Sequence, residues 1–422
     1  MRIGLALLVL LALKGGEASP SRASSFAPAP KDDVLVVKAG RIVTASGEEI
    51  TDGIILIRDG KIEAVGKGIE VPWDAKVLDV SKQVVMPGFV ETHTWRGVDR
   101  ANENVPSVPF VSTFDSVNPL DPYFEDSLRQ GITTLYVSPG NGTMIGGQGC
   151  VLRPVGAITE SMVVVKNHAL KLSLDPRSGM SRMAHLAALR RELDEVVDYL
   201  KDHEEKRKEV PTAAGTPAGP APEMEIKREV MAKFLQGKLA AFVYCPTASD
   251  VLRAIELSKK YKFKMKLVLG RDTWKAAPDI AREKLEVVLP PDMIFWETDE
   301  EKHEEVLRVL PAIFAKAGVK FAFQTEASST GSGYLWYQAA AAVRHGLSKA
   351  DAIRAVTRTP AEILGIDARV GTLEKGKDAN LVVLTGDPLD ARTWVDLVLV
   401  EGKTVYERSK DSKLKRILGA EK

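Results

Sequence analysis

The chain has 422 residues, of which 45% are hydrophobic and 27% charged, an ordinary composition for a globular protein with a normal core. Its 58 lysines and arginines nearly balance 57 aspartates and glutamates, so we expect no basic surface for nucleic acid or anionic lipid. Cys150 and Cys245 lie in no CxxC spacing, which favours two buried free thiols over a zinc ribbon.

The first 18 residues have the pattern of a secretory signal peptide. Arg2 gives a positive start, residues 3–13 are apolar, and small residues precede a cleavage point after Ala18. The apolar run is too short to span a bilayer stably. We therefore predict a secreted or periplasmic protein with no membrane segment in its mature form; an uncleaved anchor is the alternative. Residues 19–31, rich in Ser, Pro and Ala, predict a disordered leader.

Both ends of the remaining chain have the pattern of short strands. Residues 54–58 and 61–65 flank Asp59-Gly60, a hairpin signal because glycine accepts the positive φ of a type I′ turn. Near the C-terminus, residues 380–384, 397–400 and 404–406 are further strand candidates.

Between these ends, strand and helix patterns alternate, which predicts a parallel barrel with helices outside it. We count seven or eight strands, of which the third has the weakest pattern. Residues 181–203 predict a long amphipathic helix and residues 306–317 a second one that ends at Gly318. Residues 204–223, a charge cluster followed by a Pro/Ala/Gly-rich run, predict a flexible insertion.

Several segments resemble signatures of the amidohydrolase superfamily. Residues 86–94 (M-P-G-F-V-E-T-H-T) resemble the family's first barrel strand. Residues 357–365 (T-R-T-P-A-E-I-L-G) and 371–383 (G-T-L-E-K-G-K-D-A-N-L-V-V) resemble its C-terminal signature. The G-G-Q-G run at residues 146–149 is similar to the imidazolonepropionase-like branch.

This resemblance implies an α/β protein with a (β/α)8 TIM-type barrel at residues 86–366. A small β-sandwich is expected from both chain ends, residues 32–85 and 367–410, followed by a tail at 411–422. Family members bind divalent metal, which lowers the pKa of a bound water and polarises the scissile carbonyl. The implied ligands are H-x-H on strand 1, a carboxylated Lys or a Glu on strand 4, histidines on strands 5 and 6, and an Asp on strand 8.

Three histidine ligands implied by the resemblance are missing. His93 matches the first histidine of H-x-H, but Trp95 holds the second place, and an indole N–H has no lone pair to give. Residues 244–251 (Y-C-P-T-A-S-D-V) align with a family run that carries two histidines. Residues 269–274 (L-G-R-D-T-W) align with the strand-6 histidine.

The residues that remain are His93 and Lys171 as candidate ligands of an incomplete metal site, and Glu326 as a candidate catalytic carboxylate. Structural alternatives stay open: His93 is also compatible with a packed core histidine, and Glu326 with a salt bridge to Lys171 or Arg271. Cys245 as a nucleophile with His93 as its base is a further alternative. The expected pocket residues are Trp95, Tyr244, Cys245 and Trp274.

Energetics decide what to expect of a cofactor. A complete zinc site is worth about 10–16 kcal/mol, and the loss of even one outer-shell partner costs about 10–100-fold in affinity. We therefore expect no tightly bound cofactor; the alternative is one weakly bound zinc.

Two functions remain open. One is a non-catalytic relative that binds a small molecule or partners an intact paralogue or its own copies. The other is an active hydrolase of non-peptide C–N bonds in small amides or cyclic imides.

Overall fold

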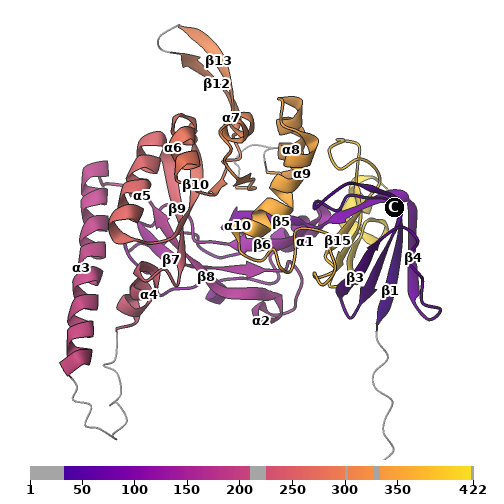
Figure 1. Ribbon diagram of the computed structural model, residues 1–422, viewed down its shortest axis with the longest axis horizontal. Helices are drawn as coiled ribbons and strands as arrows, with labels where there is room; N and C mark the ends of the chain where they lie inside the picture. Colours follow the sequence, from indigo (N-terminus) through magenta and orange to yellow (C-terminus); the bar gives the residue numbers. More distant parts are fainter. Residues whose placement is uncertain (1–32, 210–224, 300–302, 327–332, 420–422) are drawn as a thin grey trace, which may run out of the picture. The chain divides into compact units, whose positions relative to one another are not determined.

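A computed structural model describes residues 33–209, 225–299, 303–326 and 333–419 (Figure 1). The expected signal peptide and leader lie outside these ranges, as do residues 210–224 of the expected insertion. Within the described ranges, none of the helices combines the length and apolar character needed to cross a membrane.

An eight-stranded sheet forms the middle of the chain, and its strands are neighbours in sequence order. The strands are β5 (Phe89–Thr94), β6 (Ile132–Val137), β7 (Ile145–Leu152), β8 (Val163–Ser173), β9 (Ala240–Thr247), β10 (Met265–Asp272), β11 (Val287–Val288) and β14 (Phe321–Ala322). Helices α5 (Ala248–Tyr261), α9 (Lys349–Val356) and α10 (Arg358–Ile363) pack against it. The α/β architecture and the count of eight strands therefore agree with the sequence prediction.

The prediction of an all-parallel barrel is wrong at the third strand of this sheet. Strand β7 runs antiparallel to both β6 and β8. Two glycines of the G-G-Q-G run allow β7 to pack closely against the residues around it. A Cβ at Gly147 would lie 2.5 Å from the carbonyl oxygen of Val111, and one at Gly149 would lie 2.6 Å from the Tyr136 ring. Only a strand without side chains at these positions fits between its neighbours.

The edge strands of this sheet, β5 and β14, meet through side chains. The Thr92 hydroxyl donates to the Phe323 carbonyl oxygen (3.1 Å), just beyond β14. No ladder of main-chain hydrogen bonds joins β5 to β14 in the part of the chain that the structure describes, so a closed barrel is not formed by backbone pairing there.

Both chain ends contribute to a second sheet, in the order β17-β16-β15-β4-β1-β2-β3. The strands are β1 (Val34–Ile42), β2 (Ile50–Arg58), β3 (Lys61–Gly66), β4 (Lys76–Pro87), β15 (Leu381–Leu384), β16 (Val395–Val400) and β17 (Lys403–Glu407). The predicted hairpin between β2 and β3 is confirmed: Asp59 and Gly60 have φ values of 50° and 76°.

The expected sandwich is instead one seven-stranded sheet, because β4 bridges its two halves. Strand β4 pairs along its length in parallel with β1 and, at its last four residues, antiparallel with β15. Residues of both chain ends, including Ile42, Ile55, Leu381 and Leu399, share one buried cluster on this sheet.

Two helix predictions need correction. Helix α3 (Arg182–Glu209) continues through the charge cluster, so residues 204–209 are helical and not part of a flexible insertion. The predicted helix at 306–317 begins as strand β13 (Glu304–Val309), which pairs with β12 (Ile294–Asp299). Only α7 (Leu310–Lys316) is helical, beginning where Pro311 occupies the first turn.

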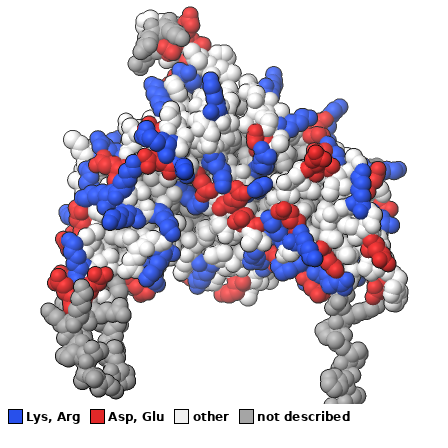
Figure 2. Space-filling model, in the orientation of Figure 1, with Lys and Arg blue, Asp and Glu red and all other residues white. Residues whose placement is uncertain are grey.

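The remaining helices connect these strands and cover the two sheets. They are η1 (Thr113–Asp115), α1 (Pro122–Arg129), α2 (Thr159–Met162), α4 (Ile226–Leu235), η2 (Trp274–Ala276), α6 (Ala277–Arg282), α8 (Leu335–Arg344), η3 (Arg408–Lys410) and α11 (Ser412–Ile417). On the face seen in Figure 2, basic and acidic side chains are intermixed.

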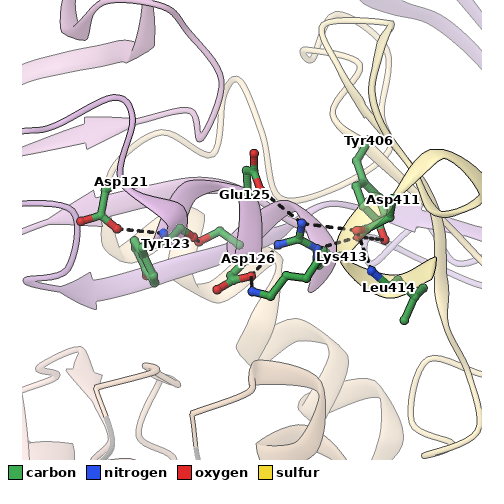
Figure 3. A network of polar contacts seen from close by, with 10 residues as sticks. Asp121, Tyr123, Glu125, Asp126, Tyr406, Asp411, Lys413 and Leu414 are labelled. Carbon is green, nitrogen blue, oxygen red and sulfur yellow. Dashed lines mark hydrogen bonds and ion pairs between the residues drawn. The ribbon is translucent and has the colours of Figure 1, made fainter. Parts of the chain in front are cut away.

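Arg129, the last residue of α1, joins the C-terminal segment to the middle of the chain. Its guanidinium pairs with Asp411 (2.6 Å), Asp126 (2.6 Å) and Glu125 (3.2 Å). Asp411 also accepts from Tyr406 Oη (3.1 Å) and caps α11 through the amide of Leu414 (3.0 Å), as Figure 3 shows. Burial opposes ionisation, but these hydrogen bonds outweigh it and lower the pKa of Asp411.

We predict that Arg129→Met lowers the free energy of unfolding by about 3 kcal/mol, because it leaves the buried Asp411 carboxylate without its cation. Urea denaturation monitored by circular dichroism measures the change. Arg416→Met, at an exposed arginine on α11, is the matched control and should change stability by less than about 0.5 kcal/mol. Equal stability of the two variants would contradict this role of Arg129.

Candidate functional site

The candidate residues gather where parallel strands end. His93 lies near the end of β5, Lys171 near the end of β8, and Glu326 four residues after β14. His93 and Lys171 have no exposed surface. Lys171 Nζ lies 2.8 Å from His93 Nε2, so the structure brings these two predicted residues into direct contact.

A chain of hydrogen bonds fixes the tautomer of His93. Gln324 donates from Nε2 to the Leu289 carbonyl oxygen (3.2 Å), which turns its Oε1 toward His93 Nδ1 at 2.9 Å. An amide oxygen only accepts, so Nδ1 carries the proton. The lone pair of His93 therefore lies on Nε2, where it accepts a hydrogen bond from Lys171.

Burial shapes the protonation of this pair. It lowers the pKa of His93 well below its usual range, and the neighbouring Lys171 lowers it further, so the imidazole is neutral. Burial also lowers the pKa of Lys171 to about 7. The aliphatic part of Lys171 packs against β7: a Cβ added at Gly146 would lie 3.3 Å from Lys171 Cβ. Glycine of the G-G-Q-G run thus makes room for the lysine.

Glu326 is held by the end of β5. Its Oε1 accepts hydrogen bonds from the Thr94 hydroxyl and from the Trp95 amide (2.8 Å). Burial raises the pKa of Glu326, while these donors and the charge of Arg96 partly offset the rise. The Trp95 ring meets the His93 ring edge-on, with centroids 5.8 Å apart. Trp95 is therefore a direct neighbour of His93, and Glu326 is bound to the two residues that follow His93 in the chain.

Sequence reasoning missed a second buried carboxylate, Glu91, in the same strand. Its Oε1 accepts from the His93 amide (3.0 Å), and burial raises its pKa to about 8. Glu91 Oε2, Tyr123 Oη and Thr325 Oγ1 are buried and form no hydrogen bond with other described residues. Glu91 stands in the quoted strand-1 motif, so its position was visible, but nothing in the sequence indicated its burial.

The expected pocket residues divide into two groups. Tyr244 and Cys245 on β9 lie beside Lys171, with Lys171 Nζ 5.8 Å from the Tyr244 ring centroid. Burial raises the pKa of Cys245 well above its usual range, which disfavours a thiolate nucleophile. Trp274 in η2 instead stacks under Arg308 (4.0 Å), and within the described ranges no ring contact links it to His93.

The two runs that align with histidine-bearing strands of the family pack directly against each other. Pro246 ends the Tyr244-Cys245-Pro246 run, and Gly270 lies in β10 beside it. A Cβ at Gly270 would lie 2.6 Å from the Pro246 carbonyl oxygen and 2.7 Å from its Cα. Such distances leave no space for any side chain at position 270, so histidine does not fit there without a backbone shift.

The side chains present do not fit a divalent metal of the kind the fold family implies. The described residues contain no group of three or more His, Cys, Asp and Glu placed to hold a metal ion. The one imidazole lone pair is directed at Lys171 Nζ, and Glu326 Oε1 accepts from Trp95 and Thr94. A catalytic zinc site needs three protein ligands with free electron pairs.

An α/β sheet with polar side chains gathered at the carboxyl ends of its strands is typical of TIM-type barrel proteins. Comparisons with known proteins show what this chain is similar to. A family model described as "Amidohydrolase family" matches residues 272–405. The solved structure of an amidohydrolase from Thermotoga maritima MSB8 is 29% identical, with a TM-score of 0.79 over 89% of this chain and 100% of that chain.

Sequence relatives agree. Imidazolonepropionase from Symbiobacterium thermophilum is 37% identical over 79 residues, 15% of this chain and 19% of the relative. Amidohydrolase tasK from Hapsidospora irregularis is 22% identical over 388 residues, which is 82% of this chain. The match covers only 39% of that relative, so this chain spans less than half the length of tasK. Together these matches support a relationship to the amidohydrolase superfamily.

We predict that Lys171→Met lowers the free energy of unfolding by about 1–3 kcal/mol, because it leaves His93 Nε2 as a buried acceptor without a donor. Urea denaturation gives the value. Lys264→Met, at an exposed lysine just before β10, should shift stability by less than about 0.5 kcal/mol. Wild-type stability of Lys171→Met would show that the hydrogen bond contributes nothing.

Proposed function

We propose that this chain is a non-catalytic member of the amidohydrolase superfamily that keeps the fold to bind a small molecule or a partner subunit. The observation that carries the proposal is the contact between His93 Nε2 and Lys171 Nζ at 2.8 Å. This contact uses the one lone pair that the strand-1 histidine has for a metal ion.

The surroundings of His93 support the same conclusion. Trp95 holds the second strand-1 position and supplies its main-chain amide to Glu326. Pro246 lies in the run aligned with the strand-5 histidines, and it packs against Gly270 in the run aligned with the strand-6 histidine. Restoring metal chemistry would therefore require several simultaneous changes in a buried and close-packed region.

We also propose a barrel closure, a cellular location and a partner for this chain. We infer a closed TIM-type barrel, a secreted or periplasmic location after removal of residues 1–18, and a partner that is an intact paralogue or a second copy. An active hydrolase of small amides or cyclic imides is the competing function, and it would depend on the buried Glu91 and the half-buried Glu326.

Metal content and turnover test the proposal together. Full-length protein purified without chelator should contain far less than one equivalent of Zn²⁺, Mn²⁺ or Ni²⁺ by elemental analysis. It should not hydrolyse a panel of small amides, cyclic imides and dipeptides, with or without added metal. A stoichiometric metal that survives dialysis, or turnover that disappears in Glu326→Gln, would overturn the non-catalytic assignment.

The variant Trp95→His tests whether restoring one histidine is enough to create a zinc site. Lys171 still occupies His93 Nε2, and Pro246, Leu269 and Gly270 have no electron pair in their side chains to give to a metal. This variant should therefore bind zinc no more tightly than the wild type. Zinc titration with a chromophoric competitor measures the affinity, and Trp296→His, on the exposed β12–β13 hairpin, is the control. Zinc bound much more tightly by Trp95→His alone would contradict the argument.

A further inference from the structure

A cavity of about 270 Å³ lies between the start of α8 and the connection from β15 to β16. Phe89 at the start of β5 and Gln130 after α1 also line it. His93 lies four residues further along β5, so roughly 13 Å of extended strand separates the Phe89 and His93 positions. The cavity therefore lies apart from the cluster around His93, and binding of a ligand in it does not depend on the proposed function.

Aromatic side chains from distant parts of the chain form the walls of this cavity. Trp394 is 47% exposed and Tyr334 is 38% exposed, although both are large and apolar. Trp336, whose ring centroid is 6.5 Å from that of Tyr334, packs on the core beside them. Exposed aromatic side chains that converge on one concave surface are typical of ligand-binding sites.

The charged groups of the lining are already neutralised by neighbours. Arg129 pairs with Asp411, Asp126 and Glu125, and Asp390 pairs with Arg392 at 2.6 Å. A charged ligand would find no free counter-ion among these two lining residues. This balance favours an uncharged ligand, since moving a charge onto an apolar wall costs its hydration.

One polar group of the lining is left unsatisfied. Gln130 Oε1 is buried and accepts no hydrogen bond from the residues that the structure describes. A buried amide oxygen without a donor costs about 1–3 kcal/mol, a cost that a ligand N–H or O–H at the same place would remove. The lining thus combines flat apolar walls with one acceptor.

We propose that this cavity binds a small, flat, uncharged ligand that carries a hydrogen-bond donor, the class represented by a simple aromatic amide. Its ring would lie against Trp394 and Trp336, and its N–H would donate to Gln130. The volume suits one ring with a short substituent, because sites for drug-sized ligands are usually about 300–1,000 Å³.

Benzamide is the probe for this site, with benzoate and benzamidinium as charged analogues of the same shape. We expect saturable binding of benzamide to the full chain by ligand-observed NMR, and at least about tenfold weaker binding of both ions. Trp394→Ala should weaken benzamide binding about tenfold, as truncation of an aromatic anchor does. Gln130→Leu should weaken it about fivefold, the factor expected for one net hydrogen bond.

Two controls keep this test independent of the proposed function and of unfolding. Trp296→Ala removes a tryptophan that is 65% exposed on the β12–β13 hairpin, and Lys171→Met changes the strand-end cluster. Both should bind benzamide as the wild type does, and circular dichroism should show all variants folded. Absence of saturable binding, equal binding of benzoate, or binding unchanged in Trp394→Ala and Gln130→Leu would overturn the proposal.

Discussion

The candidate site depends on where one electron pair points. A neutral imidazole has a single lone pair in the ring plane, and the contact of His93 Nδ1 with Gln324 assigns that pair to Nε2. Lys171 Nζ stands 2.8 Å away and receives it. Any use of His93 as a metal ligand or as a base must first displace this lysine.

The residues around these strand ends pack closely against one another. Pro246 and Gly270 pack so closely that position 270 accepts no Cβ, and Gly146 leaves room for Lys171. Close packing of this kind means that a single reversion meets steric resistance before it meets any question of chemistry. The fold itself does not require the metal ligands, since its core clusters consist of apolar residues from both sheets.

How much the sequence could predict follows from the kind of signal involved. Turn chemistry at Asp59-Gly60 and the alternation of strands and helices are local, and both gave correct elements. The all-parallel prediction was wrong because strand and helix patterns do not fix strand direction, and β7 runs antiparallel to both neighbours. The packing of the G-G-Q-G run depends on Tyr136 and Val111, which lie elsewhere in the sequence. Lys171 and His93 were both candidates, but 78 residues separate them, so their contact was beyond any local pattern.

Buried polar clusters of this kind resist gradual replacement. Glu91, His93 and Lys171 have no exposed surface, and His93 shares hydrogen bonds with both of the others. Exchanging one member for an apolar residue leaves the others unpaired in a region of low polarity, which costs several kcal/mol when a charge is involved. Exchanging all of them together is often neutral or stabilising. Stability alone is therefore a sufficient physical reason for His93 to be kept together with its buried neighbours.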